Sequence, residues 1–216
     1  YRNQWETYTT VMAEDEKIWL QQNLGASKVA AAAADPDAYG DLFQWGRWDD
    51  GHQLRTSATA NASTLSPNNP AGLGTGSQYF YIGASGSWFW QAGTGTDTWS
   101  DASPSATNGL SPCAALGAGW HIPTRAEFEN VVSKEGITDT AKGIQSNLKL
   151  VASGQRNQNN GNVTATGSTG YYWTTSFSSD ITMARNRHCI TVTSFTVATG
   201  GNFNRSAGMA VRCVKD

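Results

Sequence analysis

The sequence predicts an α+β fold in which short strands and a capped helix are joined by long irregular loops. Residues 119–135, "GWHIPTRAEFENVVSKE", carry the signature of a helix start, because Thr124 and Glu127 form a Thr-x-x-Glu capping box. The segment "YYWTTS" from Tyr171 has the aromatic and β-branched content typical of a strand. Much of the remaining chain is rich in Gly, Ser, Thr and Asn, which predicts extended loop regions.

Four further elements are expected, three before the helix and one after it. Residues 5–24 predict two short strands joined by the charged turn "EDEK". Leu42, Trp45 and Trp48 recur at three-residue spacing, which predicts a short buried helical segment. Residues 147–153 are expected to form a strand.

The predicted helix and the chain end have clear apolar patterns. Phe128, Val131 and Val132 should line one face of the helix, which Gly136 should end. The closing segment "MAVRCVKD" predicts a buried strand, with apolar side chains alternating at Met209, Val211 and Cys213.

The length of 216 residues fits a single domain, 1–216, with a loop-rich insertion at 51–112. A structureless segment of that length is uncommon inside a compact domain. We therefore expect loops and short strands there, held down by Trp88, Trp90 and Trp99.

The charge balance excludes several classes of partner. Formal net charge is −2 and only 15% of residues are charged, so no basic surface for nucleic acid or an acidic membrane is predicted. The longest apolar run, "VAAAAA" from Val29, is too short to span a bilayer. A sparsely charged chain with nine Trp is typical of extracellular domains, so we expect an extracellular or cell-surface location, or alternatively a phage virion.

The three cysteines, Cys113, Cys189 and Cys213, leave one thiol over if two of them pair. If the protein is exported, a Cys113–Cys213 bridge is favoured and Cys189 is the candidate for the free thiol. The alternative is three reduced thiols.

No catalytic signature is found, and no catalytic residue or cofactor is predicted. "GASGS" at residues 83–87 lacks the second glycine of a nucleophile elbow, and His121 beside Trp120 is expected to be a packing residue. A Cys–His hydrolase that uses Cys113 is a remote alternative. No metal ligand is assigned, but a structural Ca²⁺ stays open, because Asp35 and Asp37 match two EF-hand positions; they are otherwise turn residues.

Six spaced motifs resemble the Fibrobacter succinogenes major paralogous domain family, which occurs in exported bacterial proteins. The motifs cover nearly the whole chain outside residues 51–110, and their order is more specific than any one of them. They are "IWLQQNL" (18–24), "YGDLFQWGR" (39–47), Cys113 with "GWHIPTRAEFE" (119–129), "SGQRNQNNG" (153–161), "GYYWTTS" (170–176) and "GMAVRCVKD" (208–216).

The resemblance implies a C-type-lectin-like fold of the formylglycine-generating-enzyme type, with long irregular loops and a small mixed or antiparallel sheet. Some similar proteins are the variable proteins of diversity-generating retroelements, in which adenine mutagenesis rewrites codons near the C-terminus. The resemblance therefore implies a ligand-binding display protein and no enzyme activity. The alternatives are an adhesin or carbohydrate-binding module of fixed specificity, and a formylglycine-generating-type enzyme. The chain lacks the Glu-Pro-Asn and Trp-Asn-Asp triplets of calcium-dependent sugar binding.

The composition near the C-terminus agrees with that reading. Mutating adenines in an Asn codon cannot produce Lys, Glu, Gln, Met or Trp. Lys, Glu, Gln and Trp number 6, 6, 10 and 9 in the chain, yet none of them occurs in the 31 residues 176–206, where Met183 is the only excluded type. The alternative is that a Ser/Thr-rich surface strand simply lacks these residues.

The expected binding surface is the face formed by residues 176–206, with apolar residues as anchors. We expect it to contact a protein or glycan receptor on another cell surface. Arg185, Arg187, Arg205 and Arg212 should brace loops through carbonyl groups. The candidate ligand-contacting residues are Phe177, Asp180, Asn186, His188, Ile190, Val192, Ser194, Phe195, Thr199, Asn202, Phe203 and Asn204.

Overall fold

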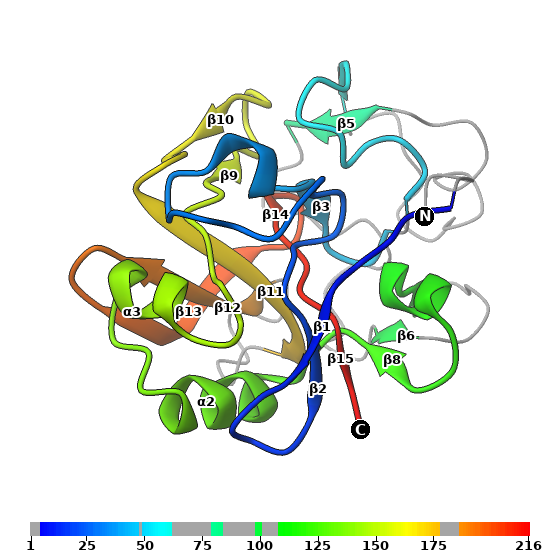
Figure 1. Ribbon diagram of the computed structural model, residues 1–216. Helices are drawn as coiled ribbons and strands as arrows, with labels where there is room; N and C mark the ends of the chain where they lie inside the picture. Colours follow the sequence, from blue (N-terminus) through cyan, green and yellow to red (C-terminus); the bar gives the residue numbers. More distant parts are fainter. Residues whose placement is uncertain (1–4, 48, 62–78, 84–97, 101–107, 178–185) are drawn as a thin grey trace.

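A computed structural model describes residues 5–47, 49–61, 79–83, 98–100, 108–177 and 186–216. These residues form a mixed α+β structure with much more sheet than helix, and they contain two α-helices, α2 (Arg125–Lys134) and α3 (Thr140–Gln145). Two short 3-10 turns, η1 (Pro36–Ala38) and η3 (Pro112–Leu116), lie in the connections. Both helices contact one three-stranded sheet (Figure 1). The α+β prediction is confirmed at this level.

The two predicted N-terminal strands are confirmed. β1 (Thr10–Met12) pairs antiparallel with β2 (Ile18–Leu20) across the charged turn. The same sheet continues through β15 (Val214–Lys215) to β8 (Trp120–His121), in the order β1-β2-β15-β8. The two ends of the chain therefore meet in one sheet, as Figure 1 shows for the segments near N and C.

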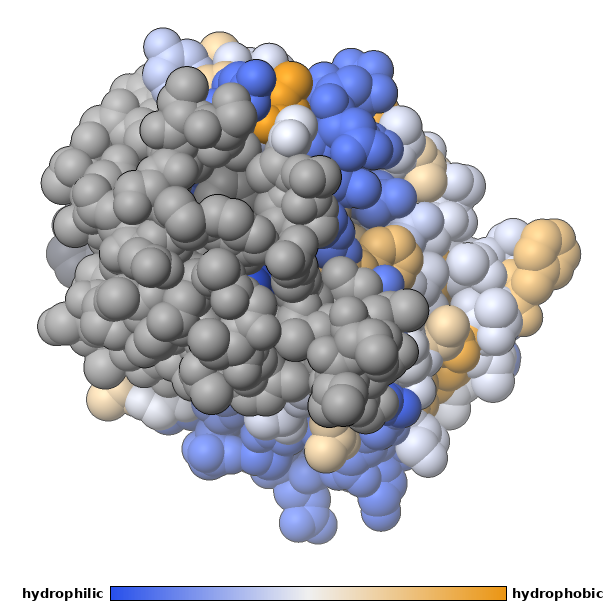
Figure 2. Space-filling model, turned by 180° about the vertical axis from the view of Figure 1, so that it is seen from behind, coloured by the Kyte–Doolittle hydropathy of each residue, from blue (hydrophilic) through white to orange (hydrophobic). Residues whose placement is uncertain are grey.

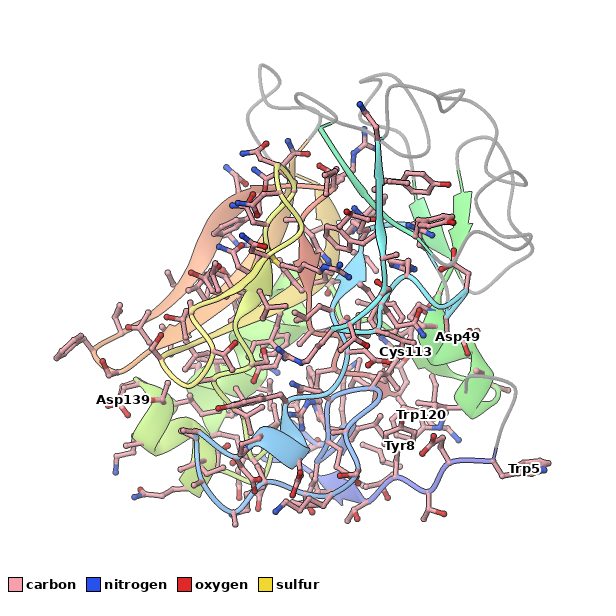
Figure 3. The ribbon with its side chains drawn as sticks, turned by 90° about the horizontal axis from the view of Figure 1, so that it is seen from above. Trp5, Tyr8, Asp49, Cys113, Trp120 and Asp139 are labelled. Atoms are coloured by element: carbon pink, nitrogen blue, oxygen red, sulfur yellow. A yellow bond between two sulfur atoms is a disulfide. The ribbon has the colours of Figure 1, made fainter. Side chains whose placement is uncertain are left out.

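Helix α2 begins where the capping box predicted. The Thr124 side chain accepts from the Glu127 N–H, and the Glu127 carboxylate accepts from the Thr124 N–H in return. Gly136, directly after the helix, has φ +63°, a conformation that favours glycine. Phe128, Val131 and Val132 are buried as expected. Helix α3, which the sequence analysis did not predict, begins directly after the capping residue Asp139 (Figure 3).

The central sheet is formed by β11 (Thr169–Phe177), β12 (Asn186–Thr193) and β13 (Val197–Asn204), in that order and antiparallel throughout. The predicted strand at "YYWTTS" lies in β11. A β-bulge interrupts the β12–β13 pairing: Cys189 pairs with Gly201 and Thr191 with Ala198.

A second four-stranded sheet corrects one prediction. Its order is β10 (Val163–Thr164), β9 (Gln155–Arg156), β14 (Gly208–Met209) and β3 (Phe43–Gln44). The helical segment predicted from Leu42, Trp45 and Trp48 is wrong, because Phe43 lies in strand β3, where it pairs with Met209, and a turn follows at residues 45–46. Leu42 and Trp45 are buried, but Gln44 between them is buried as well. The three-residue spacing therefore does not mark one buried face of a helix, because the segment is surrounded by protein on all sides. Trp48 lies outside the described residues.

The strand predicted at 147–153 is also wrong. These residues are mostly buried, but their backbone groups bond to separate partners rather than to one neighbouring strand. Leu150 N–H donates to the Gly143 carbonyl, and Ala152 N–H donates to the Ala33 carbonyl. An apolar run with this pattern indicates burial and not strand pairing.

The C-terminal segment is buried but is not one alternating strand. Met209, Val211 and Cys213 are buried, and so are Ala210 and Arg212 between them. The segment leaves one sheet after β14 and joins the other at β15. Because it runs through the interior, neither of its faces meets solvent and alternation carries no inside–outside information.

Within the predicted insertion, the structure describes four short strands in two parallel pairs. β4 (Thr59–Asn61) pairs with β5 (Phe80–Ile82), and β6 (Thr98–Ser100) pairs with β7 (Asn108–Leu110). Trp88, Trp90 and the side chain of Trp99 lie outside the described residues, so their expected anchoring role stays a prediction. The single-domain organisation stays a prediction too.

Two apolar clusters lie on opposite faces of the central sheet. The first contains Trp45, Trp173 and the cysteines Cys113, Cys189 and Cys213. The second lies between the sheet and the helices, and its members include Trp19, Phe128, Tyr172, Ile190 and Val192. The sheet that carries the expected binding surface is therefore packed on both sides over its inner half.

Candidate functional site

The candidate site is the β12–β13 hairpin, which projects from the body of the molecule beside α3 (Figure 1). Thr193 organises its tip. Thr193 N–H donates to the Thr196 carbonyl at 2.9 Å, and the Thr193 hydroxyl accepts from the N–H groups of Phe195 and Thr196 at 3.2 and 3.1 Å. These bonds hold the turn in one conformation, which lowers the entropic cost of binding through it.

Phe195 is the apolar residue that the tip presents to solvent. Its side chain is 91% exposed, and its neighbours Ser194 and Thr196 are exposed as well. Seen from behind, pale and orange residues project at the right-hand edge (Figure 2), the side on which Figure 1 places the hairpin after the half-turn. The predicted outward positions of Ser194 and Phe195 are confirmed.

Two other expected anchors belong to the core instead. Ile190 is 0% exposed and Val192 is 1% exposed, so their assignment to the ligand-binding face is wrong. Pairing sets their direction: Ile190 lies opposite Tyr172 and Val192 opposite Gly170, on the sheet face that packs against the helices. If alternate strand residues point outward, Ile190 and Val192 share one face of β12, but the helices cover that face and leave it buried.

Phe203 is half-buried and packs against the first apolar cluster. Its ring makes an edge-to-face contact with Tyr171, with ring centroids 5.5 Å apart. A Cβ atom on Gly201 would lie 3.0 Å from the Phe203 ring, so glycine lets this ring fold back over its own strand. Phe203 is therefore part of the support for the hairpin as well as of its surface, which corrects its role as a freely exposed anchor.

The remaining candidate residues fall into two groups. Thr199, Asn202 and Asn204 are half-buried on β13. The Asn204 Oδ1 atom accepts from the backbone and hydroxyl of Ser206, whereas the Asn202 Oδ1 atom is buried and has no hydrogen-bond partner among the described residues. Asp180 lies outside the described residues, and so do the side chains of Phe177, Asn186 and His188, whose backbones lie in β11 and β12.

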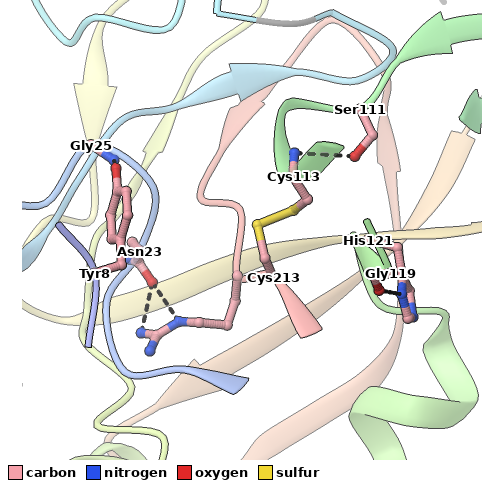
Figure 4. Close-up of a disulfide and its surroundings, with 9 residues drawn as sticks. Tyr8, Asn23, Gly25, Ser111, Cys113, Gly119, His121 and Cys213 are labelled. Atoms are coloured by element: carbon pink, nitrogen blue, oxygen red, sulfur yellow. Dashed lines mark hydrogen bonds between the residues drawn. A yellow bond between two sulfur atoms is a disulfide. The ribbon is translucent and has the colours of Figure 1, made fainter. Parts of the chain in front are cut away.

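A disulfide bridge lies in the first apolar cluster, on the face of the central sheet that is turned away from the helices. Cys113 and Cys213 are bonded, as favoured from the sequence, and Cys189 is free and buried. The bridge joins η3 to the segment before β15 (Figure 4). Burial raises the pKa of the Cys189 thiol to about 12, so it carries no thiolate at neutral pH.

Buried arginines brace the connections. Arg212 is 1% exposed and donates to the carbonyls of Leu20 and Leu148 and to the Asn23 Oδ1 atom. Burial lowers its pKa to about 10, which leaves it charged at neutral pH. The carbonyl-bracing role predicted for Arg212 is confirmed. Arg205 is also buried, while the side chains of Arg185 and Arg187 lie outside the described residues.

Sequence reasoning missed two further polar braces. Arg156 donates to the carbonyls of Leu54, Ser57 and Gly161, and its guanidinium carbon lies 4.2 Å from the centre of the Phe80 ring. An isolated arginine in a turn-rich segment gives no sequence signal that it will be buried.

The second missed brace is the Gln44 side chain, which connects three segments. Its amide nitrogen donates to the carbonyls of Tyr81 and Ser206, while its amide oxygen accepts from Tyr81 N–H and from Arg47. Arg47 in turn forms a buried ion pair with Asp50. Every atom of the Gln44 amide is thus used in holding β3, β5 and the end of β13 together.

His52 lies in this network as a neutral ring. Its Nε2 atom accepts from the Gln44 N–H at 2.9 Å, so its Nδ1 atom carries the proton and donates to Asp50. Burial, together with the nearby Arg47 charge, lowers the pKa of His52 to about 4. The ring is a structural hydrogen-bond bridge with no free nitrogen for chemistry.

His121 is an ion-pair residue, which corrects its predicted packing role. Its Nδ1 atom faces the Gly119 carbonyl at 3.1 Å and its Nε2 atom faces the Glu127 carboxylate at 3.0 Å. Because both partners are acceptors, both nitrogens donate and the ring is an imidazolium. The Glu127 hydrogen bond accordingly raises the pKa of His121.

Lys17 completes this cluster. Its ammonium bonds to Glu127 at 2.9 Å and to Asp216. Burial would raise the pKa of Glu127, but hydrogen bonds from His121, Lys17 and Thr124 outweigh it and hold that pKa far below its usual range. Ligand atoms of His121, Glu127 and Asp216 lie within 4.8 Å of one another, a spacing that suits a metal ion. Two cations and two carboxylates already balance there, so the group functions as a salt-bridge network.

We expect the His121→Gln substitution to lose stability in a pH-dependent way. The pKa of His121 is raised from 6.5 on folding, so its contribution is complete below about pH 6.5 and fades as pH rises through the folded pKa. Glu127, with a lowered pKa, keeps its charge down to pH values below 4.5. Urea unfolding should therefore show the largest difference from wild type near pH 5–6 and a smaller one above about pH 8. A difference that is constant across this range would show that the ring is not charged.

The two carboxylates considered for calcium share an ion pair with one lysine. Lys28 Nζ lies 3.1 Å from the Asp35 carboxylate and 3.5 Å from that of Asp37. Asp35 also accepts from the Ala31 N–H, and Pro36 begins η1. This is the turn geometry expected of Asp35 and Asp37, and a structural Ca²⁺ is left without independent support.

One hollow among the described residues is lined by polar side chains that lie outside the hairpin. Its volume is about 400 Å³, and it lies where the ends of α2 and α3 meet the β1–β2 turn. Glu135 spans it, accepting from the Glu14 N–H and from the backbone and amide of Asn147. This carboxylate is a connector between the turn and the helices.

Comparisons with known proteins add no relative. No protein-family model, no curated protein and no solved structure matches the chain. Among the described residues, no helix is both long and apolar enough to cross a bilayer. The assignment of function therefore depends on the site itself.

Proposed function

We propose that the chain is a ligand-binding display protein with a C-type-lectin-like fold, similar to the variable proteins of diversity-generating retroelements. In this proposal, the β12–β13 hairpin contacts a protein or glycan receptor on another cell surface, outside the cell that makes the protein or on a phage particle. The contact uses shape and apolar complementarity and involves no chemical step.

The exposed Phe195 on a hydrogen-bonded, uncharged tip is the observation that carries the proposal. The sixteen residues from Cys189 to Asn204 include no Asp, Glu, Lys or Arg. The Phe195 side chain is 91% exposed, so it adds little to the packing of the fold. Its ring can supply contact area to a partner. The Thr193 hydrogen bonds hold it ready for that contact.

The hairpin has exposed residues at its tip and buried residues at its base, and this arrangement also favours a binding function. Ser194, Phe195, Thr196 and Ala198 are exposed, while Ile190 and Val192 on the same hairpin are sealed in the core. Such a hairpin can accept substitutions at its tip without losing its anchorage. The absence of Lys, Glu, Gln and Trp from residues 176–206 agrees with substitution through adenine mutagenesis.

The cysteines support a binding function over formylglycine-generating chemistry. That chemistry needs reactive thiols, whereas Cys113 and Cys213 are bonded to each other and the Cys189 thiol has a pKa of about 12. Incubating a sulfatase peptide with the protein should therefore leave its cysteine unconverted.

Sequencing the same locus across sibling isolates tests the proposal. Substitutions should fall on the exposed hairpin positions, above all Phe195, and should spare Ile190 and Val192. Helix α2 serves as the internal control and should not vary. A nearby reverse transcriptase with a template repeat should accompany the variation. Identical hairpin sequences in every isolate would contradict the proposal and favour the alternative, an adhesin of fixed specificity. A glycan array would then test whether that adhesin binds sugar.

A further inference from the structure

The outer edge of β13 is a surface distinct from the hairpin tip. β13 is the last strand of its sheet, and within the described part of the chain no other strand pairs with it. It has eight residues, whereas the outermost strands of the two four-stranded sheets, β1, β8, β10 and β3, have two or three. The other side of the same sheet is partly covered, since Trp173 and Tyr171 of β11 exchange backbone hydrogen bonds with Ala210.

The edge exposes backbone donors that a second strand could use. Thr193 and Thr196 form the hydrogen-bonded pair that closes the hairpin, and Val197 is the next residue on β13, opposite Val192. Alternate residues of an antiparallel strand turn their N–H groups away from the partner, so the Val197 N–H faces the open side. Monomeric proteins usually guard such an edge with charge, proline or a bulge.

β13 carries only the weakest of these guards. Its sequence, "VATGGNFN", contains neither charge nor proline. The bulge places Thr199 and Gly200 together opposite Ile190 and twists the middle of the strand, but it leaves both halves of the edge open. A strand this long and uncharged is expected to find a partner.

Gly200 lies in the middle of this open edge and leaves space beside it. A Cβ atom added there would meet only the Arg125 Nη2 atom, at 3.8 Å, and the φ angle of Gly200 is not in the left-handed region. Neighbouring Gly201, in contrast, makes room for the Phe203 ring. Glycine weakens a strand and often marks a bulge or a site where another backbone comes near. The bulge suits a glycine at this position, and the missing side chain also leaves room beside the edge for a second strand.

We propose that β13 pairs antiparallel with β13 of a second copy across a two-fold axis near Gly200, joining two three-stranded sheets into one. An uncharged strand repels no charge on its own copy, so the same surface serves both sides of the contact. A two-fold contact of this kind closes at two molecules and leaves no open edge for further growth. The inference does not depend on the proposed function.

Charge placed at the axis tests the pairing. Sedimentation velocity of the wild-type chain up to the millimolar range should show a concentration-dependent dimer. Gly200→Lys and Gly200→Glu should each weaken it about tenfold or more, because like charges then face each other. Mixing the two variants in equal amounts should restore the dimer. The control pair, Thr10→Lys and Thr10→Glu, places the same charges on the exposed edge of β1 and should have no effect.

Several results would overturn the proposal. They are a wild-type chain that stays monomeric throughout, Gly200 variants that associate like wild type, a mixture that fails to recover, or an equal effect of the Thr10 pair. Amide exchange on the wild-type chain provides a measurement without any variant: protection of the Val197 N–H should rise with protein concentration. Unchanged protection would exclude pairing at this edge, whether or not the Gly200 variants fold.

Discussion

Removing the Cys113–Cys213 bridge is expected to destabilise the protein by about 4 kcal/mol, because the bridge closes a loop with a sequence separation of 100 residues. Cross-linking distant residues limits the unfolded chain far more than the folded one. The double variant Cys113→Ala/Cys213→Ala should show this loss in urea unfolding at neutral pH. For a domain whose total stability is usually about 5–15 kcal/mol, that is a large fraction.

The third cysteine provides the matched control for the bridge. Cys189 is buried but unbridged, so Cys189→Ala removes a small apolar group and should cost only about 1 kcal/mol. Adding a reductant should reproduce the double variant's loss in wild type and in Cys189→Ala, and should do nothing further to the double variant. Three titratable thiols in the unreduced, denatured protein would show that the bridge does not form.

The Ile190→Ser substitution should be nearly as damaging, with an expected cost of about 3–5 kcal/mol. Ile190 is 0% exposed and lies opposite Tyr172, in the cluster between the sheet and α2. The change removes apolar volume and buries a hydroxyl in its place. Thermal or urea unfolding measures the loss directly. A loss under about 1 kcal/mol would mean that the strand turns this side chain outward, as the sequence alone had suggested.

The contrast between helix α2 and strand β12 shows where sequence reasoning succeeds. The helix start follows from local chemistry, since Thr124 and Glu127 cap each other within one turn. In β12, inside and outside depend on which strand residue faces which partner, and that register is set by contacts far away in the chain. Ile190 and Val192 alternate with Thr191 and Thr193, and that alternation alone fits an apolar face that is buried as well as one that is exposed for binding. Phe195 was placed correctly because a turn exposes its residues whatever the register.

The burial of polar side chains in the interior was even harder to predict from the sequence. Arg212 and Gln44 are polar residues whose side chains bond to backbone groups from distant segments. No pattern in the neighbouring sequence predicts hydrogen-bond partners that lie so far away in the chain. The disulfide was different, because cysteine pairing among three residues offers few choices and the favoured pair is the one formed.

Unfolding of the Phe195→Ser variant tests most directly the claim that a rigid frame carries a replaceable tip. Phe195 is 91% exposed, and the turn around it is held by Thr193 rather than by the phenyl ring. The free energy of unfolding should therefore change by less than about 0.5 kcal/mol, while Ile190→Ser in the same hairpin loses several. A loss for Phe195→Ser that approaches the loss for Ile190→Ser would show that the tip is part of the folded core, and the account of this hairpin as a display surface would be wrong.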